Sequence, residues 1–143
     1  MTDDARGWNV HGVITWMHHV PRRVVVSVCA IAAVLVLVGA SAHVADLLGH
    51  GLHPYDWAPD RLNLYWSSLA LFDVLAAVFL IGGRRLGTDL ACAVASTDLA
   101  ANRYAVYGIR HSDLAAQPGL QRLTAFTVLV LATAPFVRRH LSG

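Results

Sequence analysis

Long apolar runs alternate with short polar segments along the whole chain. The residues from Val24 to Ala42 carry no charge, and a helix of that length spans roughly 28 Å, about the thickness of the hydrocarbon core of a bilayer. The apolar character then weakens gradually toward His50. We therefore predict a first transmembrane helix over residues 24–48.

Three further runs have a similar character, and they predict transmembrane helices over 62–83, 88–108 and 120–137. The run over 88–108 is the weakest, because it carries Asp98, Asn102 and Arg103. Short polar segments join the four runs, and short connections favour helices that alternate in direction. The predicted fold is an all-α, antiparallel four-transmembrane-helix bundle that forms a single membrane domain over residues 1–143.

The arginines support this count of spans. They stand in pairs at 22–23, 84–85 and 138–139, next to the ends of apolar runs. Four spans place all three pairs on one face of the membrane, whereas three spans without 88–108 would separate the last two pairs. Arginine gathers in the loops on the cytoplasmic side. We therefore expect a multi-pass protein of the cell membrane with both termini in the cytoplasm.

The segment before the first run has a different pattern. Val10, Val13, Ile14 and Met17 recur at helical spacing, and Pro21 ends the pattern. Such a pattern, flanked by tryptophans, predicts a short helix over 8–20 that lies in the membrane interface.

The composition agrees with a protein in lipid. Of the 143 residues, 56% are hydrophobic and 14% are charged, whereas a soluble domain has nearer a quarter charged residues. The net charge of +2 is too small for a nucleic-acid-binding surface. The two cysteines, Cys29 and Cys92, lie near the cytoplasmic ends of their helices, where thiols stay reduced. The sequence therefore argues against a soluble enzyme and against nucleic acid as a partner.

Two acidic residues lie deep in predicted spans. Asp73 and Asp98 both fall near the middle of their helices, at similar depth. A charged aspartate there costs about 2.5 to 3.5 kcal/mol on insertion scales, so such residues face the bundle interior or a wet cavity and mark functional sites. We predict that both face one pocket and act as acid and base, which makes them the candidate catalytic residues.

Polar and aromatic residues accumulate on the outer side of these aspartates. The cytoplasmic half of the second and fourth spans is almost purely apolar, so the pattern predicts a pocket that opens outward, with the aspartates as its floor. The predicted ligand-binding residues are His43, Asp46, Tyr65, Trp66, Ser68, Asn102, Arg103, Tyr104 and Tyr107. An alternative interpretation is that this polar set only holds the helices together.

A metal site is a weaker alternative at the same end. His43, Asp46, His50 and His53 offer ligand atoms that zinc accepts, but their spacing matches no established ligand motif. We therefore assign neither a metal nor a cofactor.

Several function classes fit this pattern. The chain contains no P-loop, dinucleotide-binding, serine-hydrolase or zinc-protease motif. We expect a protein that binds, and transforms by acid–base isomerisation or cyclisation, a small amphipathic or isoprenoid-like ligand. The alternatives are a proton-coupled transporter of small molecules and an accessory subunit of a larger membrane complex. The expected partners are membrane lipid, the ligand, and either a second copy of the chain or such a complex.

Overall fold

The regular structure is entirely helical within the described residues. The computed structural model describes residues 21–113 and 117–141. The helices are α2 (Arg22–His50), α3 (Asp60–Ile81), α4 (Arg85–Arg103) and α5 (Pro118–His140), and a π-helical segment, η1 (Tyr104–Ile109), continues α4. The prediction of an all-α chain is confirmed over these residues. The interfacial helix predicted over 8–20 lies outside them.

Prolines and glycines set the ends of the helices. Pro21 and Pro59 directly precede α2 and α3, and Pro118 is the first residue of α5, where its missing N–H costs nothing. Gly83 adopts a positive φ of 68°, which a residue with a side chain rarely adopts, and it reverses the chain between α3 and α4. The helices begin and end two or three residues from most of the predicted boundaries.

Three described helices, α2, α3 and α5, are long and apolar enough to cross a membrane. Large apolar side chains on their outer surfaces are more than half exposed, among them Ile31, Val38, Val78 and Val128. Soluble proteins rarely leave so much apolar surface in water, whereas lipid solvates it well. The prediction of a membrane protein is therefore supported. α4 falls outside this group of three.

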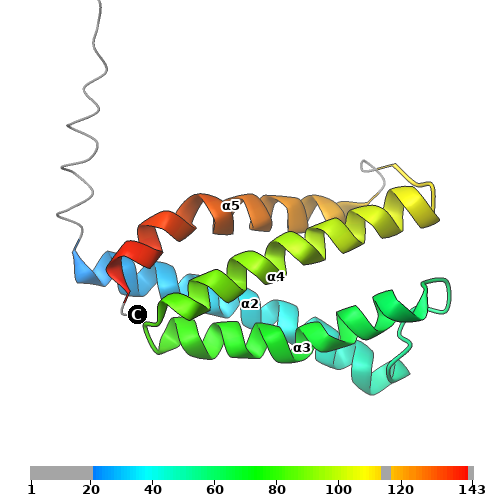
Figure 1. Cartoon of the computed structure of the whole chain (residues 1–143), viewed down its shortest axis with the longest axis horizontal. Coiled ribbons are helices and arrows are strands. Elements are labelled where there is room, and N and C mark those ends of the chain that lie inside the picture. The colour runs from blue at the N-terminus through cyan, green and yellow to red at the C-terminus, as the bar shows by residue number, and fades with distance from the viewer. Residues whose placement is uncertain (1–20, 114–116, 142–143) are drawn as a thin grey trace, which may run out of the picture.

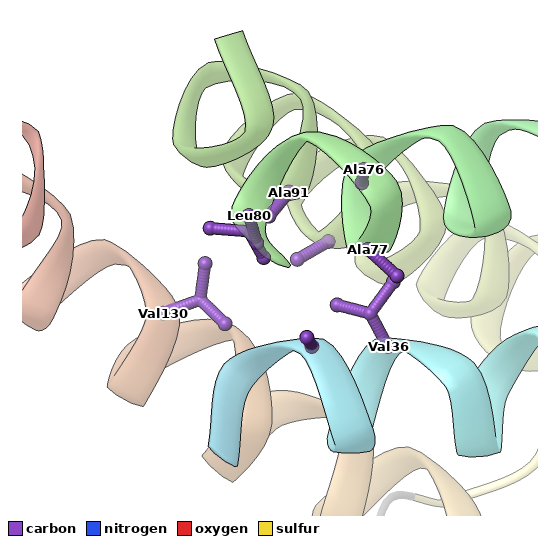
Figure 2. Close-up of a cluster of buried hydrophobic side chains, with 8 residues drawn as sticks. Val36, Ala76, Ala77, Leu80, Ala91 and Val130 are labelled. Carbon is purple, nitrogen blue, oxygen red and sulfur yellow. The ribbon is translucent and has the colours of Figure 1, made fainter. Parts of the chain in front are cut away.

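The helices pack in chain order. Figure 1 shows successive helices running in opposite directions along the long axis, with α4 between α3 and α5. α2 packs along α3, whereas α2 and α5 contact each other over a much shorter stretch. Figure 2 shows the largest core cluster, to which all four helices contribute through Val36, Ala76, Ala77, Leu80, Ala91 and Val130. Alanine dominates this core, and small residues allow helices to approach closely.

α3 and α4 approach each other closely at Gly87. A Cβ atom at this position would collide with the backbone nitrogen of Leu80 and would lie 2.7 Å from the carbonyl carbon of Phe79. Backbone atoms cannot rotate away as side chains can. The packing of α3 against α4 therefore requires glycine at this point.

The paired arginines gather at one end of the molecule. The Arg85 Nε donates a hydrogen bond of 3.0 Å to the carbonyl oxygen of Leu141, and Arg138 lies 3.4 Å from the Asp89 carboxylate. The start of α2 joins them, because Val25 and Cys29 pack against Val137 and Leu141. We call this the arginine end, and the opposite end carries the connection between α2 and α3 together with η1.

Candidate functional site

A small hollow lies at the end opposite the arginine end. Its volume is about 220 Å³, below the usual range for drug-sized ligands. Polar and aromatic side chains that border it are His43, Tyr55, Trp57, Trp66, Asn102, Arg110 and Gln117. Ala105, Val106, Gly119 and Leu120 complete its lining. We call it the aromatic hollow.

Three aromatic rings form one wall of the aromatic hollow. The ring of Tyr55 meets that of Trp66 edge-on at a centroid distance of 5.1 Å, and Trp57 lies 5.6 Å from Tyr55 and 6.2 Å from Trp66. The guanidinium of Arg110 lies 5.3 Å from the centre of the Trp57 ring, within the range of a cation–π contact. This wall is therefore apolar with a cation at one edge.

Asn63 fixes the connection that carries two of these rings. It is 1% exposed, its Nδ2 donates to the carbonyl oxygens of Tyr55 and Ala58, and its Oδ1 accepts from the Tyr55 N–H. All three bonds are 3.0 or 3.1 Å long. A buried amide satisfied by backbone groups on both sides holds the connection in one conformation.

Tyr55 also ties this connection to the end of α2. Its hydroxyl donates a 2.8 Å hydrogen bond to the Oδ2 of Asp46. Burial, with the hydrogen bond to Asp46 and its negative charge, raises the pKa of Tyr55 from 10.0 to about 12. The phenol therefore stays protonated at physiological pH and acts as a hydrogen-bond donor.

We predict that Tyr55→Phe lowers the free energy of unfolding by about 1 kcal/mol, the usual net value of one hydrogen bond. Since the folded state raises the pKa of Tyr55, the stabilisation is full below pH 10 and is lost as the pH rises toward 12. Denaturant titration of both proteins at pH 7 and pH 11 measures this. The matched control is Tyr104→Phe, because Tyr104 is 49% exposed. Equal losses in the two variants at pH 7 would contradict the prediction.

Asp98 lies directly behind the aromatic hollow. Its Oδ1 accepts a 2.8 Å hydrogen bond from the Nδ2 of Asn102, one helical turn further along α4. The Trp66 side chain also approaches this carboxyl as a hydrogen-bond donor. Asn102 and Trp66 both border the aromatic hollow. Two of its lining residues thus connect the hollow to the carboxyl of Asp98.

Asp73 lies on α3, opposite Gly39 of α2. It is 6% exposed, and no hydrogen bond or ion pair reaches its carboxyl from the described part of the chain. A Cβ atom at Gly39 would lie 3.2 Å from its Oδ2, so a side chain at this position would crowd the carboxyl and require a small shift of it. The negative charge of an ionised Asp98 acts on the Asp73 carboxyl.

The other predicted ligand-binding residues have different positions. The Tyr65 hydroxyl donates a 2.7 Å hydrogen bond to the Thr97 Oγ1, which links α3 to α4, and the Ser68 hydroxyl donates to the carbonyl oxygen of Tyr65. Tyr104 and Tyr107 are 49% and 41% exposed, and the Arg103 guanidinium lies over the Tyr107 ring at 5.8 Å. None of these five residues borders the aromatic hollow.

A π-helical segment ends the predicted helix over 88–108, because the chain widens into η1 at Tyr104. Within η1, Ala105 and Val106 are buried while Tyr104 and Tyr107 face outward. The residues that sequence reasoning missed are Tyr55, Trp57, Arg110, Gln117 and Gly119.

The histidines near this end do not meet in a metal site. Over residues 21–113 and 117–141, no group of three histidine, cysteine or acidic side chains has the geometry to hold a metal ion. His43 borders the aromatic hollow, whereas the Nε2 of His53 lies 3.5 Å from the Asp60 carboxylate at the surface. His43 and His53, two of the residues in the alternative metal set, therefore have different neighbours.

No known protein family, curated protein or solved structure matches this chain.

Proposed function

We propose that the chain crosses the membrane four times as an antiparallel bundle, with α4 and η1 as the third span. The contacts of α4 support this count. Asp98 receives donors from Asn102 and Trp66 inside the bundle, and Asp89 pairs with Arg138 of α5 in a half-exposed contact at the arginine end, so both acidic side chains have partners. Polar groups in a span are tolerated when the neighbouring helices satisfy them.

The arginine end supports the proposed orientation. A chain with three spans would place 84–85 and 138–139 on opposite faces of the membrane, yet Arg85 contacts Leu141 and Asp89 contacts Arg138 at the same end. By the bias of arginine toward the cytoplasmic side, both termini face the cytoplasm and the aromatic hollow faces outward.

The proposed activity is binding of a small amphipathic, isoprenoid-like ligand in the aromatic hollow. The observation that carries it is the pair of lining residues, Trp66 and Asn102, that connect the hollow to Asp98. The apolar part of the ligand packs against the aromatic wall, and its hydroxyl bonds to the polar side chains at the base. The small volume selects a short ligand over a full-length lipid.

The two carboxyls extend this proposal to acid–base chemistry. Neither carboxyl borders the aromatic hollow itself, so this chemistry requires the double bond of the ligand to pass between Trp66 and Asn102 and reach them. One aspartic acid then donates a proton to that double bond, and the second carboxylate removes a proton from a neighbouring carbon. The double bond shifts, no co-reactant is consumed, and the product is an isomer. The aromatic faces of Trp57 and Trp66 stabilise the intermediate cation.

A fluorescence titration tests binding. Trp8 and Trp16 are replaced by phenylalanine, so that only Trp57 and Trp66 emit, and the isoprenoid alcohol geraniol is added to the protein in detergent. We expect saturable quenching in this background. The hydrocarbon myrcene, which lacks the hydroxyl, should bind about tenfold more weakly, because the polar groups at the base then lose their partner.

Two glycines provide a matched pair of variants for this titration. Gly119 borders the aromatic hollow and Gly49 lies in α2 away from it, and a Cβ atom at either position meets nothing within 4 Å. Gly119→Leu should fill the hollow and abolish saturable quenching, whereas Gly49→Leu should leave it unchanged. Equal quenching in the two variants would overturn the proposed site.

A further inference from the structure

A second and larger hollow lies at the arginine end, between the first turns of α4 and the last turns of α5. Its volume is about 530 Å³. Arg85, Arg138 and Arg139 border it, together with a single acidic residue, Asp89. It shares no lining residue with the aromatic hollow. We call it the basic hollow.

The basic hollow has an excess of unpaired positive charge. Asp89 compensates only Arg138, from which it lies 3.4 Å away. Within the described ranges, no carboxylate lies within ion-pair distance of Arg85 or Arg139. The hydrogen bond from the Arg85 Nε to Leu141 holds that guanidinium in place and leaves its terminal nitrogens for a guest. Two guanidinium groups at one site favour a phosphate group over a halide ion. Each planar guanidinium can donate two parallel N–H hydrogen bonds, and these match the spacing of two phosphate oxygens.

The backbone adds to this preference. α4 begins at Arg85, and its first turn contains no acidic residue and receives no hydrogen bond from a capping side chain. The N–H groups in the first turn of a helix carry partial positive charge, which attracts anions. The start of α4 therefore reinforces the arginines.

Thr88 is an independent indication of a guest. It borders the basic hollow, it is 5% exposed, and its hydroxyl has no hydrogen-bond partner among the described residues. A buried polar group without a partner costs about 1–3 kcal/mol. A change of the Thr88 side-chain rotamer would turn this hydroxyl into the hollow, where a phosphate oxygen would accept its hydrogen bond and remove the cost.

The remaining lining residues are apolar. Ala134 and Pro135 of α5 and Cys92 of α4 border the hollow on the side toward the membrane interior. The hollow is thus basic at its opening and apolar further in, and it lies at the arginine-rich end of the molecule. This arrangement suits a lipid whose phosphate head group contacts the arginines and whose acyl chains contact the apolar side chains.

We infer that the basic hollow binds a phosphate group, with an anionic phospholipid as its source. This site is separate from the aromatic hollow and does not rest on the proposed ligand of that hollow. The proposed topology determines only the face of the membrane on which the basic hollow opens. Its ligand is recognised by Arg85, Arg139 and the Thr88 hydroxyl together.

Native mass spectrometry of the detergent-solubilised full chain tests this inference in three arms. The protein is mixed with phosphatidylglycerol, with diacylglycerol, which lacks the phosphate, or with inorganic phosphate alone. We expect a bound phosphatidylglycerol and no bound diacylglycerol. Binding of inorganic phosphate without phosphatidylglycerol would assign the site to free phosphate, and binding of neither would overturn the inference.

Three variants identify the site. Arg139→Gln and Thr88→Val should each weaken phosphatidylglycerol binding about tenfold, the usual effect of losing one hydrogen bond to a charged group. Arg23→Gln removes the same charge at the arginine end from a residue that does not border the hollow, so binding should be unchanged. Thr88→Val leaves the charge of the hollow intact. A loss of binding in this variant therefore indicates a specific hydrogen bond and not a general electrostatic attraction to the arginine end. Equal losses in Arg139→Gln and Arg23→Gln, or no loss in Thr88→Val, would overturn the inference.

Discussion

Replacement of Gly87 by alanine is expected to lower the free energy of unfolding by about 3 kcal/mol or more, at the upper end of the cost of overpacking a core. Alanine normally stabilises a helix by about 1 kcal/mol relative to glycine. At Gly87 the added carbon would collide with the backbone of Leu80 and Phe79, and α3 and α4 would have to separate. Unfolding by sodium dodecyl sulfate in mixed micelles, followed by circular dichroism, measures the loss.

Gly49 provides the control for this prediction. It also lies in a helix, but a Cβ atom there meets nothing within 4 Å, so Gly49→Ala should be as stable as the wild type or slightly more stable. If Gly87→Ala unfolds at the same detergent fraction as Gly49→Ala, α3 and α4 do not approach each other as described.

Conversion of Asp73 and of Asp98 to asparagine is expected to change stability in opposite directions. Asp73 is buried without a hydrogen-bond partner in the described chain and lies in the field of a second carboxyl, so Asp73→Asn should stabilise the protein by about 2 kcal/mol. Asp98 accepts from Asn102 and Trp66, so Asp98→Asn should destabilise it by about 1 kcal/mol. The same unfolding titration measures both values.

Combined with an activity measurement, this pair separates a catalytic role from a structural one. We expect the wild type to convert geraniol into isomers that gas chromatography resolves, and Asp73→Asn to lose this conversion while becoming more stable. A stabilised variant that retains full conversion would remove Asp73 from the mechanism. A marked loss of stability in Asp73→Asn would instead indicate that its carboxyl holds the helices together.

The sequence predicted the helices well because lipid imposes a simple rule on them. A run without charges, such as Val24 to Ala42, has few alternatives to a helix, and prolines at 21, 59 and 118 fix where helices begin. Residues 88–108 contain polar and charged side chains, so hydropathy alone predicted this helix less clearly. Only the contacts of Asp89 and Asp98 with other helices show how α4 accommodates its charges.

The site was harder to predict than the fold. Depth along a helix selected Asp73 and Asp98 as candidates, because depth depends only on counting residues from a span end. The lining of the aromatic hollow depends on how the 51–59 connection folds back and on the turn at 104–109, and neither segment has a periodic pattern of hydrophobic residues. Tyr55 and Trp57 were therefore not predicted as lining residues, and the predicted residues Tyr104 and Tyr107 do not border this hollow.

The π-helical segment has a consequence for how this end of the protein tolerates change. Each hydrogen bond in η1 encloses one residue more than in an α-helix, and one residue of an α-helix corresponds to a rotation of about 100°. Loss of a single residue between Tyr104 and Ile109 would straighten the turn and swing Arg110 away from the Trp57 ring. Substitutions there alter one side chain at a time, whereas a one-codon deletion would reorient every side chain of the segment that follows it.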